Sequence, residues 1–180
     1  MINGKILMSL TELEILIEKY KDEAKESYHN QEFSSDFLLA MRYLFNGFFQ
    51  AEGSWSGKFH SSSSHHFSPI FSIGQNISDK SLQFFSLLWV ILGCQLKWSI
   101  SKNQSGKYHI QLRSTNKEYI MSVLFPYLSL TYGEKFTAMA KLSRIDELNC
   151  LNTLSSRLEI INLAYSLTPG GGGVETVLLH

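Results

Sequence analysis

The chain has 180 residues, of which 44% are hydrophobic, 13% aromatic and 18% charged. This composition excludes an intrinsically disordered chain, and the length suits one domain with a sizeable core. The longest apolar run, Leu87 to Cys94, is far shorter than the roughly 20 residues of a membrane span, and no basic, hydrophobic leader is recognisable at Met1. Cys94 and Cys150 form no paired motif, so we expect both to be core residues rather than disulfide partners or metal ligands.

The formal net charge is zero, from 16 basic and 16 acidic residues. A neutral chain is by itself a poor partner for polyanionic nucleic acids. The charges are nevertheless segregated: residues 1–36 contain eight acidic and four basic residues, whereas residues 54–117 contain seven basic residues and one acid. Four of the six histidines lie in the same basic segment. We therefore expect the middle of the chain to present an anion-binding surface.

Two helices are predicted at the start of the chain. Ser9 and Glu12 form a capping box, and the apolar residues that follow recur at helical spacing as far as Tyr28. Residues 34–36 offer an N-cap for a second helix, Phe37 to Glu52, which Gly53 ends. Because this second helix is apolar on several sides, we expect it to be central.

After Gly53 the hydrophobic period changes to two, which predicts two β-hairpins around a helix from Asp79 to about Gly93. Residues 61–64 and 103–106 are the expected loops, and Pro69 indicates an edge or a bulge. Polar and basic side chains alternate along all four strands and define what we call the polar face. Its residues are Ser54, Ser56, Lys58, His60, His66, Ser68, Ser72, Lys97, Ser99, Ser101, Lys107, His109, Gln111 and Arg113.

Two or three helices complete the predicted domain, at residues 115–125, 133–148 and about 153–167, and a glycine-rich tail that we expect to be flexible follows at 168–180. No repeat is found within the chain. If function requires two helix–hairpin–helix–hairpin units, they must therefore come from two chains.

The segment LFNGFFQAEGSW, residues 44–55, carries the sharpest functional signal. Gly47 and Ala51 are one helical turn apart, and small residues at this spacing let two helices approach closely. Glu52 then stands at the C-terminal end of the same helix. A carboxylate at the tip of a helix that packs against its twin brings two acids, and hence divalent cations, close together. An ordinary core helix with an exposed terminal glutamate remains the alternative.

The sequence resembles the LAGLIDADG homing endonuclease family in two blocks, FNGFFQAEG at residues 45–53 and FSIGQNISDKSL at residues 71–82. The resemblance implies an α+β fold with an αββαββα core at residues 36–167, preceded by an N-terminal helical extension at 1–35. It also implies a homodimer whose interface contains Gly47, Phe48 and Ala51, and a sheet whose polar face lies in the DNA major groove. There, lysines would contact phosphates, and side chains of the polar face would contact base edges, among them Lys58, His60, His66, Lys97, His109 and Gln111.

The same resemblance implies a catalytic site. Glu52 would be the metal ligand, the carbonyl of Ala51 an additional ligand, Gln75 a residue that positions water, and Arg113 a basic residue that polarises the site. Gln50 replaces the first acid of the family motif, which we expect to be harmless because that acid is not the principal ligand. The implied reaction is hydrolysis of double-stranded DNA at a long site with Mg²⁺ or another divalent cation.

Two other functions remain open, an RNA-splicing maturase and a non-catalytic DNA-binding regulator on the same fold. The resemblance favours an intron-encoded, organellar origin, in a mitochondrion or chloroplast. A zinc site at His65 and His66 is not expected, because adjacent residues of a strand point to opposite faces. Lys135 and Lys141 are interpreted as surface lysines that at most contact phosphate.

Overall fold

The structure is a computed structural model that describes residues 9–30, 33–60, 63–102 and 106–167. Its elements follow the predicted order and give an α+β fold, which confirms the fold class. The elements are α1 (Leu10–His29), α2 (Ser35–Glu52), β1 (Gly53–His60), β2 (Ser63–Asn76), α3 (Asp79–Ile91), β3 (Lys97–Lys102), β4 (Tyr108–Ser114), α4 (Lys117–Tyr119), the π-helical turn η1 (Ile120–Leu124), α5 (Phe125–Tyr127), α6 (Gly133–Asn149) and α7 (Leu154–Tyr165).

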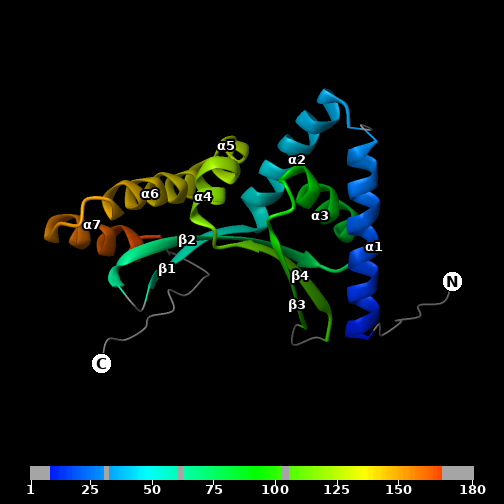
Figure 1. Ribbon diagram of the computed structural model, residues 1–180, viewed down its shortest axis with the longest axis horizontal. Helices are drawn as coiled ribbons and strands as arrows, with labels where there is room; N and C mark the ends of the chain where they lie inside the picture. The colour runs from blue at the N-terminus through cyan, green and yellow to red at the C-terminus, as the bar shows by residue number, and fades with distance from the viewer. Residues whose placement is uncertain (1–8, 31–32, 61–62, 103–105, 168–180) are drawn as a thin grey trace.

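The four strands form one antiparallel sheet in the order β1-β2-β4-β3. Helices α1, α2 and α3 lie toward one end of this sheet, and α6 and α7 lie toward the other (Figure 1). β4 pairs with β2 only from Phe71 to Asn76. Pro69 therefore lies in the part of β2 that β4 does not reach, which agrees with its predicted edge position.

One face of the sheet forms the core with the helices. Trp55, Phe71 and Leu112 point into it and are at most 4% exposed. Phe49 of α2 stacks on Phe71 with ring centroids 5.4 Å apart, and Phe125 meets Trp55 edge-on at 4.9 Å. Burial of these large rings supplies the main free energy that holds α2 on the sheet.

The N-terminal helix belongs to the same core, because Leu13 and Ile17 of α1 are buried and α1 packs along α3. The Nζ of Lys21 lies 5.3 Å from the ring centroid of Trp89 and 5.0 Å from that of Trp98. Apolar packing and the cation–π contacts of Lys21 therefore hold α1 on the domain, and its many acidic side chains do not take part in these contacts. In the described part of the chain, no helix has the length and apolar character needed to cross a membrane.

Several sequence expectations need correction. Cys94 and Cys150 are exposed and not core residues. The first loop is shorter than predicted, because β1 continues to His60 and β2 begins at Ser63. The N-cap of α3 is Ser78 rather than an acid, since its hydroxyl accepts a hydrogen bond from the Ser81 backbone N–H. The predicted turn at 103–106 and the tail at 168–180 fall largely or wholly outside the described residues.

Candidate functional site

The carboxylate of Glu52 is presented to solvent at the C-terminal end of α2. Glu52 and Ala51 are both exposed, and β1 starts at the next residue. The last turn of α2 contains no basic residue, so its partial negative charge adds to that of the carboxylate and favours a cation. The described residues contain no group of three or more histidine, cysteine, aspartate or glutamate side chains that could hold a metal.

Lys135, which the sequence analysis interpreted as a surface lysine, reaches this helix end from α6. Its Nζ donates a hydrogen bond to the Gly53 carbonyl and lies 5.7 Å from the ring centroid of Phe49. Burial lowers the pKa of Lys135, while the nearby carboxylates of Glu134 and Glu52 oppose that shift. The interpretation as a surface lysine was wrong: the contact spans 82 positions of the chain, a separation that local periodicity does not encode.

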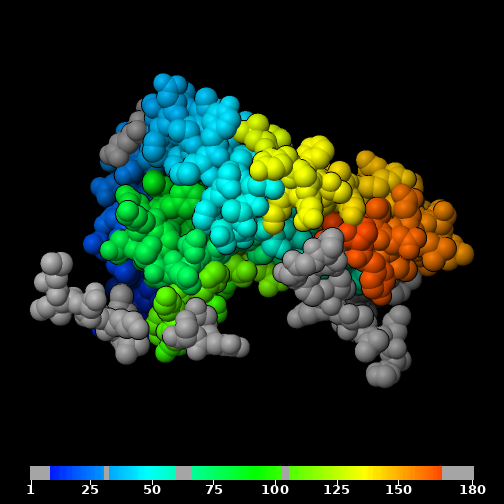
Figure 2. Space-filling view, turned by 180° about the vertical axis from the view of Figure 1, so that it is seen from behind, coloured from blue at the N-terminus to red at the C-terminus, as the bar shows by residue number. Residues whose placement is uncertain are grey.

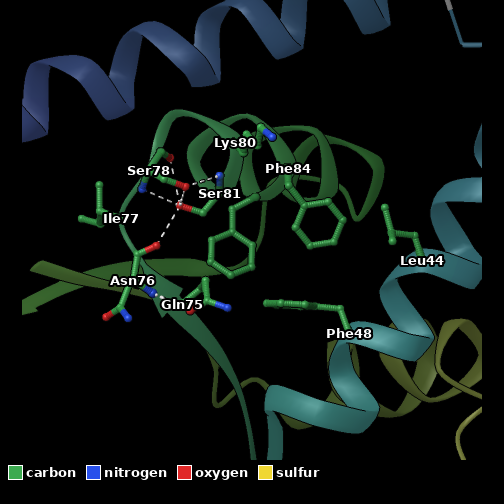
Figure 3. Close-up of a pocket in the computed structure, with 10 residues that line it drawn as sticks. Leu44, Phe48, Gln75, Asn76, Ile77, Ser78, Lys80, Ser81 and Phe84 are labelled. Atoms are coloured by element: carbon green, nitrogen blue, oxygen red, sulfur yellow. Dashed lines mark hydrogen bonds between the residues drawn. The ribbon is translucent and has the colours of Figure 1, made fainter. Parts of the chain in front are cut away.

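Gln75 lies beside the same end of α2. Gly53, the first residue of β1, pairs with Ile73 of β2. β2 therefore continues beyond the start of β1, and Gln75 lies in this continuation, next to the last turn of α2. It lines a groove of about 550 Å³ between α2 and α3, together with Leu44, Phe48 and Lys80. Figure 3 shows Gln75 near the ring of Phe48, on the helix side of β2, and its Oε1 accepts a hydrogen bond from the Asn76 N–H at 2.8 Å. Lys80, which the sequence analysis did not assign to the site, lines the same groove as Gln75 and brings an amine to it.

Arg113 occupies a different place. It pairs with Ser72 on one side and Lys97 on the other, in a row that starts at Ser54. By the alternation of the strand, it shares the polar face and not the helix face on which Gln75 lies. Ser54 follows Glu52 by two positions, so this row begins next to the candidate site. The role expected for Arg113 stays a prediction.

The strand registers assemble most of the polar face as predicted. Lys58 pairs with Ser68, Gln111 with Ser99, and His109 with Ser101. Ser56 pairs with Ile70, whose burial interrupts the face. A Cβ at position 74 would lie 2.4 Å from His109 Nε2, so Gly74 makes room for this imidazole.

Two of the three remaining histidine and lysine positions of the predicted polar face have described side chains. His66 is exposed and lies beside Asn149 and Arg157, near the ends of α6 and α7. Lys107 is exposed immediately before β4. The side chain of His60 falls outside the described part of the structure.

One side of α2 is buried in the core, as expected of a central helix, but the opposite face is uncovered. This α2 outer face consists of Ala40, Tyr43, Leu44, Gly47 and Ala51, all exposed. Figure 2 shows the light-blue and cyan surface of α2 between the green of α3 and the yellow of α5 and α6. Outside the adjacent backbone of α2 itself, a Cβ at Gly47 would meet no atom of the described residues within 4 Å. Phe48, at the margin of this face, packs edge-on against Phe84 and Phe85 at 5.3 and 5.8 Å.

Comparison with solved structures identifies the fold. The homing endonuclease I-CeuI, in a complex with DNA, aligns with 97% of this chain and 93% of its own at a TM-score of 0.63 and 13% identity. The LAGLIDADG enzyme I-SmaMI bound to cleaved DNA aligns with 73% of this chain at a TM-score of 0.59 and 20% identity. The chain has the LAGLIDADG homing endonuclease fold. A third relative of this fold, I-TnaI, aligns with 72% of this chain and 89% of its own at a TM-score of 0.52 and 17% identity.

The matched LAGLIDADG proteins differ in length. This chain spans 45% of I-SmaMI but nearly all of I-CeuI. No family model and no curated protein matches the sequence. At these identities the comparisons establish the architecture, and the activity has to be argued from the residues of this chain.

Proposed function

We propose that the protein is a site-specific, divalent-metal-dependent endonuclease that cuts double-stranded DNA as a homodimer. The observation that carries the proposal is the position of Glu52. It is exposed at the tip of a helix whose outer face is uncovered, and it adjoins a sheet with a polar and basic face. LAGLIDADG-fold relatives with solved DNA complexes support the same assignment.

A second copy of the chain is the partner that fits the α2 outer face. Gly47 and Ala51 leave space for close approach of another helix, and Tyr43 and Leu44 add apolar area that is 60% and 56% exposed. A two-fold interface is self-complementary, so the same small-residue face serves on both copies. Such a dimer brings a second Glu52 carboxylate beside the first.

The donor set at this helix end fits Mg²⁺. Mg²⁺ takes oxygen ligands, commonly one or two carboxylates together with waters and substrate phosphates. Glu52, the carbonyl of Ala51 and a second Glu52 from the partner subunit would be the protein ligands. A bound Mg²⁺ supplies Lewis-acid activation of water and neutralises charge on the leaving oxygen.

The other residues near Glu52 serve the substrate. The half-buried ammonium of Lys135 offers a hydrogen-bond donor and positive charge next to the phosphate that is cut. Gln75 holds both an acceptor and a donor on its amide and can orient a water molecule. The polar face docks in the major groove, where its lysines contact phosphates and His109 and Gln111 contact base edges.

Replacing the proposed metal ligand tests the function. Glu52→Gln keeps the size of the side chain but removes the negative charge, so we expect cleavage of a target selected from a DNA library to fall by roughly a hundredfold or more. DNA affinity should change little, because Glu52 is not on the polar face. The measurements are single-turnover cleavage with Mg²⁺ and an equilibrium binding assay without metal.

Glu26→Gln on α1 is the matched control, because this glutamate is exposed and belongs to another element. It should cut DNA at the wild-type rate. Cleavage by Glu52→Gln at that same rate would contradict the metal assignment. Tight binding without any cleavage by the wild-type protein would instead indicate the DNA-binding regulator.

A further inference from the structure

Three polar side chains on one side of α2 hold the segment between α5 and α6. Arg42, Asn46 and Gln50 are spaced four residues apart and therefore lie in one line along the helix. Arg42 donates to the carbonyls of Pro126 and Tyr127 at 2.8 and 3.2 Å. Further along the helix, Asn46 Oδ1 accepts from the Leu130 N–H at 3.1 Å, and Gln50 Oε1 accepts from the Tyr132 N–H at 3.1 Å.

The middle residue of this line, Asn46, is buried, and both its amide nitrogen and its amide oxygen form hydrogen bonds. Asn46 is 4% exposed, and its Nδ2 donates to the carbonyls of Arg42 and Tyr127 at 2.8 and 2.9 Å. A buried amide with all of these partners fixes its surroundings, since losing one partner leaves a polar group unsatisfied. The segment from Pro126 to Leu130 is thus held firmly on α2.

Gln50 is the last contact before α6 begins, and it acts where that helix has no cap of its own. Tyr132 is the N-cap residue of α6 but makes no side-chain capping bond. Gly133, with φ of 57°, then turns the chain into the helix, and Lys135 lies in the first turn. The hydrogen bond from the Tyr132 N–H to Gln50 therefore sets where the first turn of α6 lies relative to the end of α2.

We propose that Gln50 is a positioning residue that holds Lys135 against the Gly53 carbonyl beside Glu52. This inference rests on the proposed endonuclease function for its catalytic consequence, but not for its structural one. It also gives another physical reason for the expectation that glutamine in place of the first motif acid is harmless. The side chain at position 50 must be an acceptor for the Tyr132 N–H, and both glutamine and glutamate meet that requirement.

The kinetic test compares Gln50→Ala with Gln50→Glu. The alanine variant loses the acceptor, and we expect its single-turnover cleavage rate with Mg²⁺ to fall roughly 10- to 100-fold through misplacement of Lys135, with an unchanged Kd for DNA. The glutamate variant should keep a rate close to wild type. Gln83→Ala is the matched control, because Gln83 is exposed on α3, and its rate should equal that of the wild type.

A double-mutant cycle with Lys135→Ala separates positioning from a general structural role. If Gln50 acts through Lys135, Gln50→Ala costs nothing further once Lys135 is alanine. Additive losses from the two substitutions would overturn the proposal. A Gln50→Ala rate within about twofold of wild type would overturn it as well.

A third measurement needs no DNA. It tests the positioning role of Gln50 separately from the proposed endonuclease function. Lysines labelled by ¹³C reductive methylation are titrated by NMR, and Lys135 is identified by the signal missing from Lys135→Arg. Release of Lys135 to solvent removes the burial that lowers its pKa, so its pKa should rise in Gln50→Ala and stay low in Gln50→Glu. An identical titration of Lys135 in wild type and Gln50→Ala contradicts positioning even if the protein cuts DNA. The predicted shift without any cleavage by the wild type contradicts only the endonuclease.

Discussion

Gly53 is required by a close contact and not by an unusual backbone angle. Its φ of −80° is open to any residue. A Cβ at this position would, however, lie 2.0 Å from Cδ2 of Phe49. Phe49 is fully buried and stacked on Phe71, so its ring has little room to move. Glycine therefore lets the chain pass from α2 into β1 directly over a core aromatic ring.

We expect Gly53→Ala to lower the free energy of unfolding by about 1–3 kcal/mol, because the added methyl group overpacks the core. Urea denaturation followed by circular dichroism measures this loss. The control is Gly47→Ala in dilute monomer, where the open surroundings and better helix propensity should raise stability by up to ~1 kcal/mol. Equal stability of Gly53→Ala and the wild type would show that the Phe49 ring can yield.

At the scale of elements, the sheet has the apolar core on one face and solvent on the other. The helix face carries buried residues such as Phe71 and Ile110, and the polar face carries exposed Lys58 and Lys97. Because alternate residues of a strand point to opposite faces, one run of sequence serves both the core and the ligand. Folding in this way places Lys58, Lys97 and Arg113 of an overall neutral chain on a single surface.

Removing two lysines of the polar face tests that surface as the DNA-docking site. The double variant Lys58→Ala with Lys97→Ala should weaken binding to all DNA sequences. The slope of log K against the logarithm of the salt concentration should become less steep by about two, since each lost phosphate contact contributes about 0.9 to it. A salt titration by fluorescence anisotropy measures the slope.

The matched control is Lys19→Ala with Lys25→Ala on α1, which removes the same charge away from the sheet. It should leave the slope nearly unchanged. If both double variants showed the same slope, net charge alone would account for binding and docking through the polar face would be excluded.

At the scale of the whole molecule, the α2 outer face is where we propose that a second copy of the chain binds. Tyr43, Leu44 and Gly47 are exposed on the helix that also presents Glu52, so the proposed interface and the candidate catalytic centre share one helix. Two copies joined here would place two polar faces side by side for two half-sites of DNA. A long target site follows from that arrangement.

A large side chain at Gly47 should separate the two copies. Gly47→Leu fits the isolated chain, since no described residue outside the adjacent backbone of α2 lies within 4 Å of its Cβ, but it blocks the close approach of a second α2. We expect analytical ultracentrifugation to show a dimer for the wild type and a shift of at least tenfold toward monomer for the variant. Double-strand cleavage should decline in parallel. A wild-type protein that stays monomeric on its DNA target would remove the dimer from the mechanism.

The sequence by itself determined the local structure and much of the candidate site. Capping residues such as Ser9 and Glu12 fixed helix starts, and period-two alternation assigned residues to the two faces of the sheet. These signals work because they reflect interactions between residues close along the chain. Glu52 could be singled out for the same reason, since its position at a helix end is a local property.

Only the tertiary structure decided which distant residues meet at that helix end. Lys135 and Gln50 each contact a partner 82 positions away, and no local pattern distinguishes such a lysine from one on the surface. Gly47 and Ala51 already indicated close packing of this helix against another. The exposure of the α2 outer face in one chain appeared only after folding, because an apolar helix has the same sequence pattern whether its neighbour is the same chain or a second copy. Periodicity predicts that a side chain is buried. The packing of elements far apart in sequence determines which residues it is buried against.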